Sequence, residues 1–378
     1  MQRCNQRLII LGPFHRPNSN SGSDIEDQDE DYPTVLQDMT DQEIIDFVAR
    51  LNNLHDTHVR SPLEIAPDKS SFHLASPISD ELGPRTRKHL EQIGSIIGQL
   101  VQLELLQNNT CFVEMGAGRG QLGHELYGCV KDDPTVHIAL IERDHQRYRY
   151  DSYHRIQGQG PSFQRYRIDI RDLHLPELPA ISQVEPRPHI VIISKHLCGS
   201  ATDLALRCAR HAHQVNGQVR AVIIALCCHH RVVWNDYVGK RFFHRTNLTS
   251  KDFSVIRALT SWCTSENRHR LPEEAKRATI GKSSLLIIHS SYSSHVLNLD
   301  GIVFEITSTT PNERSRYSKQ RLFTIEQQEQ IGLKAKRLLD WGRLEYMQNH
   351  GFEAYLQVYA SKSITLENIA LIARPKSS

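Results

Sequence analysis

The chain has 378 residues, of which 39% are hydrophobic, 23% charged and 7% aromatic. This length and composition are those of a globular protein with a sizeable buried core, and they exclude a fibrous or wholly disordered chain. The longest apolar runs, such as residues 221–228, have the length of buried strands and fall well short of the ~20 residues of a membrane-spanning helix. A soluble protein without membrane association is expected.

The eight cysteines are scattered, without the C-x-x-C pairs of a zinc ribbon. Reduced thiols and an intracellular location, cytoplasmic or nuclear, are therefore expected, and no metal site is predicted. The formal net charge is +2, but six acidic side chains lie between residues 24 and 31. The remainder is mildly basic, which permits an RNA partner and equally fits an ordinary solvated surface.

Composition divides the chain into three parts. Residues 1–38 are expected to form a disordered acidic tail, residues 39–87 a helical and loop segment, and residues 88–378 one large domain with an insertion at 264–320. Helical spacing of apolar residues predicts helices over 44–56 and 88–107. Near the end, Thr324 and Gln327 have the spacing of a capping box, and Gly351 is placed to end that helix.

Short apolar runs alternate with helical patterns in the centre of the chain. The runs lie at residues 111–115, 136–142, 163–170, 189–194 and 221–228. Strands separated by helix-length segments predict an α/β, doubly wound, mostly parallel sheet. Two further runs, 353–360 and 368–374, read as a final hairpin.

The segment FVEMGAGRG, residues 112–120, places a glycine-rich turn directly after the first run. A dinucleotide site needs G-x-G-x-x-G, but Gln121 stands where the third glycine belongs, which leaves a nicotinamide oxidoreductase a distant alternative. A phosphate-binding P-loop fails, because only the tail Gly281-Lys282-Ser283 is present and Lys276 occupies the first glycine position. The form E-x-G-x-G-x-G instead suits S-adenosylmethionine.

Acidic residues end the first three strands. Glu114 is placed to anchor polar groups of the cofactor, Glu142 to accept hydrogen bonds from ribose hydroxyls, and Asp169 to receive an adenine amino group. Each acid alone also fits a surface position or a helix cap, but three in register favour a methyltransferase. The predicted cofactor-binding residues are Glu114, Gly116, Ala117, Gly118, Gly120, Glu142 and Asp169.

Two motifs follow the fourth and fifth strands. In SKHLCGSATDLAL, residues 194–206, Ser200 and Asp203 have capping-box spacing, while Lys195 and His196 lie where ligands gather in α/β sheets or else line a solvated loop. In CCHHR, residues 227–231, an extended backbone would place Cys227 with His229 on one side and Cys228 with His230 on the other. These four are therefore not expected to bind one zinc ion, and one pair is expected to face the cleft.

Five segments together resemble the eukaryotic tRNA 2′-O-methyltransferases that modify the fourth nucleotide of the acceptor stem: FVEMGAGRG, SKHLCGSATDLALRC, ALCCHHR followed by WNDYVGK, KAKRLLDWGRLEYMQNHGF and ITLENIALIA. The resemblance covers about residues 80–374. It implies S-adenosyl-L-methionine as cofactor, tRNA for Gly, Pro and His as partner, and a seven-stranded class I S-adenosylmethionine-dependent methyltransferase sheet over residues 88–378. The catalytic neighbourhood that it implies comprises Lys195, His196, Cys227, His229, His230 and Arg231.

The chain departs from the family in two places. No Cys/His zinc-module spacing occurs before residue 80, and Val232 follows CCHHR where the family has a cysteine. Two alternatives stay open: a methyltransferase acting on protein or small molecules, and a catalytically silent RNA-binding protein working with a partner.

Methyl transfer would need a proton acceptor, for which Lys195, His229 and His230 are the candidates, and Arg231 is expected to position a phosphate. The basic residues of the last predicted helix either contact tRNA or form a solvated face; they are Lys334, Lys336, Arg337 and Arg343.

Overall fold

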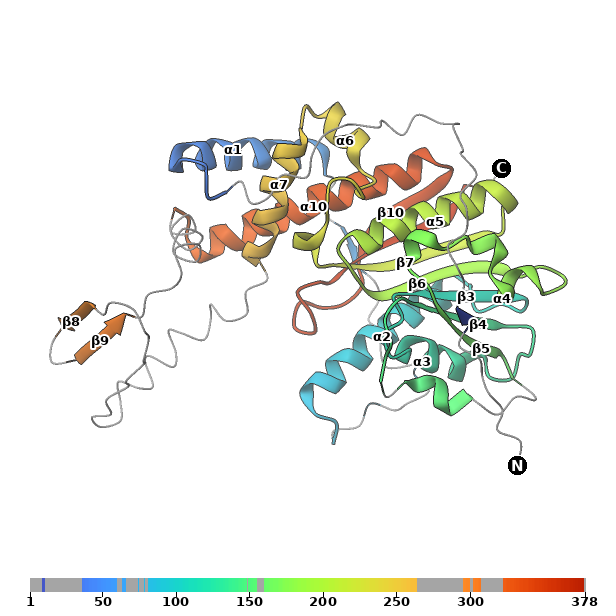
Figure 1. Cartoon of the computed structure of the whole chain (residues 1–378). Coiled ribbons are helices and arrows are strands. Elements are labelled where there is room, and N and C mark those ends of the chain that lie inside the picture. The colour runs from blue at the N-terminus through green and yellow to red at the C-terminus, as the bar shows by residue number, and fades with distance from the viewer. Residues whose placement is uncertain are drawn as a thin grey trace.

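The computed structural model describes residues 9–10, 36–59, 63–65, 74, 78, 81–147, 149–154, 160–263, 295–299, 302–306 and 322–376. Within this part of the chain, helices cover both faces of one large sheet (Figure 1). The sheet has nine strands in the order β1-β5-β4-β3-β6-β7-β11-β10-β2. In chain order these are β1 (Ile9–Ile10), β2 (Glu64–Ile65), β3 (Thr110–Met115), β4 (His137–Glu142), β5 (Ser162–Arg167), β6 (His189–Cys198), β7 (Val219–Cys227), β10 (Phe352–Val358) and β11 (Ile369–Pro375).

The sheet is mixed. Strands β5, β4, β3, β6 and β7 are parallel, whereas β11 runs antiparallel to both of its neighbours, β7 and β10. The predicted α/β class and the final hairpin are thus confirmed. Two-residue strands extend each edge: β1, from the predicted acidic tail, pairs with β5, and β2 pairs with β10.

The helices follow from caps and apolar spacing. They are α1 (Asp41–His58), α2 (Pro84–Gln102), α3 (Gln121–Val130), α4 (Pro179–Ser182), α5 (Ser200–Asn216), α6 (Lys240–Arg245), α7 (Ser250–Leu259) and α10 (Ile325–Asn349). The capping box of Thr324 with Gln327 is present, and Gly351 follows α10 with a φ of +90°. Helix α2 ends before the predicted residue 107, because Glu104 adopts a left-handed φ of +55°.

Successive side chains of each strand point to opposite faces of the sheet and pack into two hydrophobic cores, one on each face. In β3, Val113 and Met115 belong to the core beneath α5 and the second half of α10, whereas Phe112 belongs to the core beneath α2 and α3. This alternation is why strands buried on both faces read as continuous apolar runs in the sequence.

A third core lies away from the sheet, where α1, α6 and α7 gather around α10 (Figure 1). Trp234 and Tyr237 form its centre, together with aromatic side chains that cross at steep angles, among them Phe243 and Phe253. This core fixes the position of α10 relative to the residues that follow β7.

The predicted insertion is described only in part. Strands β8 (His295–Leu299) and β9 (Ile302–Ile306) pair antiparallel within it. The rest of the predicted insertion lies outside the described residues, as does the predicted tail except for residues 9–10 and 36–38. No helix in the described part of the chain is both long and apolar enough to cross a membrane.

Candidate active site

The glycine loop between β3 and α3 has a left-handed backbone. The φ angles of Gly116, Gly118 and Gly120 are +63°, +51° and +81°, a region that glycine adopts without steric cost. A Cβ at Gly116 would lie 2.8 Å from Leu197 Cδ1, so the loop presses against the end of β6. A Cβ at Gly118 would meet nothing within 4 Å, so this part of the loop faces open space where a ligand can approach the backbone.

The predicted acids lie along the same edge of the sheet, at the ends of β3 and β4 and just after β5. Glu114 is buried, and its Oε2 accepts a hydrogen bond from the Gly123 amide at 2.9 Å. Burial raises the pKa of Glu114 to about 8. Glu142 accepts from the amides of Gly118, at 2.7 Å, and Asp144, at 2.9 Å. Glu142 therefore holds the loop through the Gly118 amide, and Glu114 ties the first turn of α3 to the end of β3.

Asp169 and Ala117 complete the predicted cofactor set. Asp169 caps a short 3₁₀ turn, η2 (Ile170–Asp172), by accepting from the Arg171 amide at 2.9 Å. Ala117 is buried, and its amide donates to the Ile141 carbonyl at 3.0 Å, which ties the loop to β4.

Sequence reasoning missed Arg165, a β5 residue that supports the glycine loop. Its buried guanidinium donates to both oxygens of Asp151, at 2.7 and 2.8 Å, and to the Gly118 carbonyl at 2.8 Å. The charged residues inside the run FQRYR were the only signal in the sequence. The partner Asp151 lies in a short 3₁₀ helix, η1 (Tyr150–His154), which no pattern in the sequence predicts.

The end of β6 carries a bulge. Ser194 pairs with Ile224, but Leu197 pairs with Leu226, so β6 has one residue more than β7 over this stretch. Bulges re-aim side chains and are frequent beside active sites. Here the residues between the two pairs are Lys195 and His196, both predicted as site residues.

Lys195 points to α2, where its Nζ lies 2.7 Å from Nδ1 of His89. Burial lowers the pKa of Lys195 to about 8. The pKa of His89 is lowered to about 4, by burial first and then by the nearby Lys195 charge. His89 was missed by sequence reasoning, because it lies 106 residues from Lys195 in a helix that reads only as packing.

Four side chains from the two strand ends meet beyond the bulge: His196, Cys198, Cys227 and Cys228. Cys198 pairs with Cys227 across the parallel strands, and Cys228 turns back with a φ of +52°. The prediction that CCHHR alternates sides is therefore wrong, because the strand ends at Cys227 and the left-handed Cys228 breaks the alternation.

His229 lies in the short 3₁₀ turn η4 (His229–Arg231) and is not among the four clustered residues. It is buried, and its Nε2 lies 2.6 Å from Asp340 Oδ1 of α10. The expectation that Cys227 and His229 share a side is thus wrong. His230 and Arg231 are exposed on the same turn, and partial burial lowers the pKa of His230.

Asp340 belongs to a buried ion network. Arg343 donates to both oxygens of Asp203, at 3.1 and 2.7 Å, and lies 3.4 Å from Asp340, which also pairs with Arg337. Burial alone would raise the pKa of Asp340, but His229 and the two arginines together lower it to about 2.

The capping box predicted at the start of α5 is wrong. The Asp203 carboxylate accepts hydrogen bonds from Arg343, and the Ser200 hydroxyl accepts one from the Val233 amide at 3.0 Å. The N-cap position is Gly199, which makes no side-chain cap.

The prediction that the basic residues of α10 form a solvated face or contact tRNA is also wrong. Arg343 is fully buried, and Lys336 is buried with its Nζ 2.8 Å from Glu367. Lys334 pairs with Asp56 at 3.0 Å. These cations join α10 to the rest of the protein.

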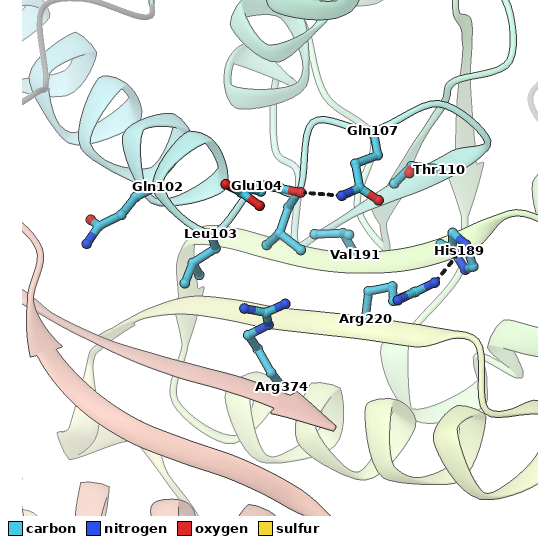
Figure 2. A pocket seen from close by; sticks show the side chains of 10 residues that line it. Gln102, Leu103, Glu104, Gln107, Thr110, His189, Val191, Arg220 and Arg374 are labelled. Carbon is cyan, nitrogen blue, oxygen red and sulfur yellow. Dashed lines mark hydrogen bonds between the residues drawn. The ribbon is translucent and has the colours of Figure 1, made fainter. Parts of the chain in front are cut away.

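A hollow of about 180 Å³ lies at the opposite, amino-terminal edge of the strands (Figure 2). Thr110, His189 and Arg220 mark the starts of β3, β6 and β7 there, and Arg220 contacts His189 at 3.0 Å. None of the predicted site residues lines it, and ligands of α/β sheets bind at the other edge. The carboxyl edge is therefore the candidate active site.

Known proteins resemble the chain over most of its length. It is 28% identical to the tRNA:m(4)X modification enzyme TRM13 homolog of Homo sapiens, covering 100% of this chain and 83% of that protein. It is 29% identical to the homolog of Mus musculus, with 99% and 82% covered, and 28% identical to tRNA:m(4)X modification enzyme TRM13 of Schizosaccharomyces pombe, with 99% and 89% covered.

Among solved structures, a cyclopropane-fatty-acyl-phospholipid synthase-like protein from Lactobacillus casei is 10% identical, with 87% of this chain and 99% of that chain covered, and its TM-score of 0.28 is too low to inform on function. The profile of the family described as methyltransferase TRM13 matches residues 91–374, which include every predicted site residue. The chain therefore belongs to the TRM13 methyltransferase family.

Proposed function

We propose that this protein transfers a methyl group from S-adenosyl-L-methionine to the ribose 2′-hydroxyl of nucleotide 4 in the acceptor stem of tRNA, within the cytoplasm or nucleus. Membership of the TRM13 family supports the reaction, and its relatives are named tRNA:m(4)X modification enzymes. The observation that carries the proposal is the contact between the glycine loop and the β6 bulge. It brings the expected cofactor loop and Lys195 to one place.

The residues at the carboxyl edge fit the cofactor. Three left-handed glycines give an open approach at Gly118, and the order of the seven central strands with reversed β11 supports a class I methyltransferase. Glu142 would hold the ribose, because each carboxylate oxygen keeps a lone pair after accepting one amide. Asp169 would lie toward the adenine. When bound, S-adenosyl-L-methionine supplies an activated methyl group.

The chain's own part in the reaction is to position the acceptor. An in-line displacement gains most of its acceleration from alignment of the reacting atoms. Lys195, whose Nζ lies 2.7 Å from His89 Nδ1, would orient the 2′-hydroxyl and, as the neutral amine, take up its proton. His229 acts through the turn that it anchors to Asp340, which presents His230 and Arg231 to solvent, where the planar guanidinium suits a phosphate.

Nucleoside mass spectrometry tests the proposal. Unmodified tRNA for Gly, Pro and His is incubated with the protein and S-adenosyl-L-methionine, beside matched tRNA with a 2′-deoxyribose at nucleotide 4. We expect a 2′-O-methylated nucleoside at position 4, absent from the deoxy tRNA. Lys195→Met should lower the rate by about 10²-fold or more, whereas Lys251→Met, an exposed residue of α7, should not change it.

Other outcomes would contradict the proposal. Methylation that persists on the deoxy tRNA would exclude the 2′-oxygen of nucleotide 4 as the methyl acceptor. Tight tRNA binding without affinity for S-adenosyl-L-methionine would indicate a silent RNA-binding protein. Methylation of protein or small molecules without retention of tRNA would indicate another acceptor class.

A further inference from the structure

We propose that His196, Cys198, Cys227 and Cys228 form a zinc site of the Cys₃His type that joins the ends of β6 and β7. One ligand atom from each residue lies within 4.8 Å of every other. Among the described residues no other group of three or more potential ligands is this compact. The site was not expected from the sequence, where the four residues form two motifs some 30 positions apart.

The distances are close to those that a bound ion requires. His196 Nε2 lies 3.2 Å from Cys198 Sγ, Nδ1 lies 3.3 Å from Cys227 Sγ, and the sulfurs of Cys198 and Cys228 are 3.3 Å apart. In a tetrahedral zinc site, with zinc–sulfur bonds of about 2.3 Å, ligand atoms are separated by roughly 3.4–3.8 Å. Movements of a few tenths of an ångström, and a turn of the exposed imidazole ring, would make room for the ion.

The backbone brings these side chains together by specific means. Pairing of Cys198 with Cys227 puts two thiols side by side on neighbouring strands, and the left-handed Cys228 adds the third. Gly199 has a φ of +58°, and a Cβ there would lie 2.7 Å from the Arg231 carbonyl oxygen, so the two loops are packed backbone to backbone. Thiols form only weak hydrogen bonds, so hydrogen bonding does not explain why three of them lie together here.

The ligand chemistry selects the ion. Calcium and magnesium prefer oxygen ligands, and iron–sulfur clusters are held by four cysteines as a rule. Three thiolates and one imidazole are a common structural zinc set, and four protein ligands leave no open position for a reacting water. His196 and Cys227 would then be structural ligands rather than catalytic residues, and the ion would hold the β6 bulge on which Lys195 sits.

Elemental analysis of the purified full chain, dialysed against metal-free buffer, tests the site. We expect about one zinc per chain. Cys198→Ser and Cys228→Ser should each lower the zinc content roughly fivefold, whereas Cys129→Ser, an exposed cysteine outside the cluster, should leave it unchanged. His196→Gln alters an exposed side chain, so it tests the ligand set if a cysteine variant fails to fold.

Cobalt(II) provides a second measurement on the wild-type fold. Cobalt in the site should give thiolate charge-transfer absorption and the visible bands of tetrahedral coordination, both lost in Cys228→Ser and kept in Cys129→Ser. The proposal would be overturned if wild-type protein contained no zinc and gave none of these bands after addition of cobalt(II). Zinc retained equally by all cysteine variants, or a Cys198–Cys228 disulfide found by peptide mass spectrometry, would also overturn it. These readouts need no tRNA and no methyl transfer, so they stand apart from the proposed function.

Discussion

The glycine loop after β3 and the CCHHR turn after β7 lie at the same edge of the sheet, but different forces hold them. Backbone conformation and backbone hydrogen bonds shape the glycine loop: its glycines are left-handed, the Gly118 amide donates to Glu142, and the Gly118 carbonyl accepts from Arg165. Buried charges hold the CCHHR turn, because His229 is anchored to Asp340 of α10. The loop is thus held through its own backbone by residues of β4 and β5. The turn is held through a buried side chain by a helix 111 residues away.

This difference predicts where the protein is most sensitive to substitution. The ion network contains fully buried charges that depend on each other, so losing one leaves the others without compensation. The glycine loop is held mainly through its backbone conformation and its backbone hydrogen bonds, so single substitutions there should cost less stability.

The largest expected effect is that of Arg343→Met. The substitution keeps much of the side-chain volume but leaves Asp203 and Asp340 buried without their shared cation. We expect the free energy of unfolding to fall by about 3–5 kcal/mol, measured by urea denaturation.

Arg245→Met is the matched control, because Arg245 pairs with Glu345 at the surface and is 48% exposed. It should cost about 1 kcal/mol or less. Equal losses in the two variants would show that the network adds nothing beyond a surface pair.

The same contrast explains what could be predicted from the sequence. The strands, the position of the glycine-rich turn after β3, the final hairpin and the cap at Thr324 can be read from residues near one another in the chain, and these predictions are confirmed. The pairing of His229 with Asp340 depends on how α10 packs on the sheet, which no local pattern reveals. Asp203 and Arg343 were misread for the same reason, since a capping box and a basic helix face are common local patterns.

Glu114→Gln should change how stability depends on pH. The folded pKa of Glu114 is about 8, above its ordinary value of 4.5, so its contribution to stability is complete below about pH 4.5 and is lost as the pH rises toward 8. Glutamine stays neutral and can still accept from the Gly123 amide. Relative to wild type, the variant should therefore gain about 3 kcal/mol between pH 5 and pH 8.

Urea denaturation of both proteins at several pH values measures this gain. A difference that stays constant over the range would show that Glu114 is ionised in the folded protein, and the first turn of α3 would then be held by charge as the CCHHR turn is.

Two glycine substitutions separate backbone strain from close contact. Gly118 and Gly199 both have positive φ, but a Cβ at Gly199 would meet backbone and side-chain atoms of Arg231 at 2.7–2.9 Å, whereas one at Gly118 would meet nothing. Gly118→Ala should cost about 1–2 kcal/mol of stability from backbone strain alone. Gly199→Ala should cost about 1 kcal/mol or more beyond that, because backbone atoms cannot yield as a side-chain end does.

Thermal and urea denaturation of the two variants would compare these costs. Similar losses of stability in the two variants would mean that the loops after β6 and β7 can move apart at no cost in free energy.

The smallest expected effect is that of Thr324→Ala, which removes the N-cap of α10. Its hydroxyl accepts from the Gln327 amide at 3.2 Å on the exposed first turn. Loss of the cap should cost about 1 kcal/mol, measured by urea denaturation. The first turn can fray without moving Asp340, because Asp340 lies four turns further on and is held by Arg343 and His229. The rate of methyl transfer to tRNA should therefore be unchanged. A fall in that rate would mean that the whole of α10, and not its buried charges alone, positions the turn that carries His229.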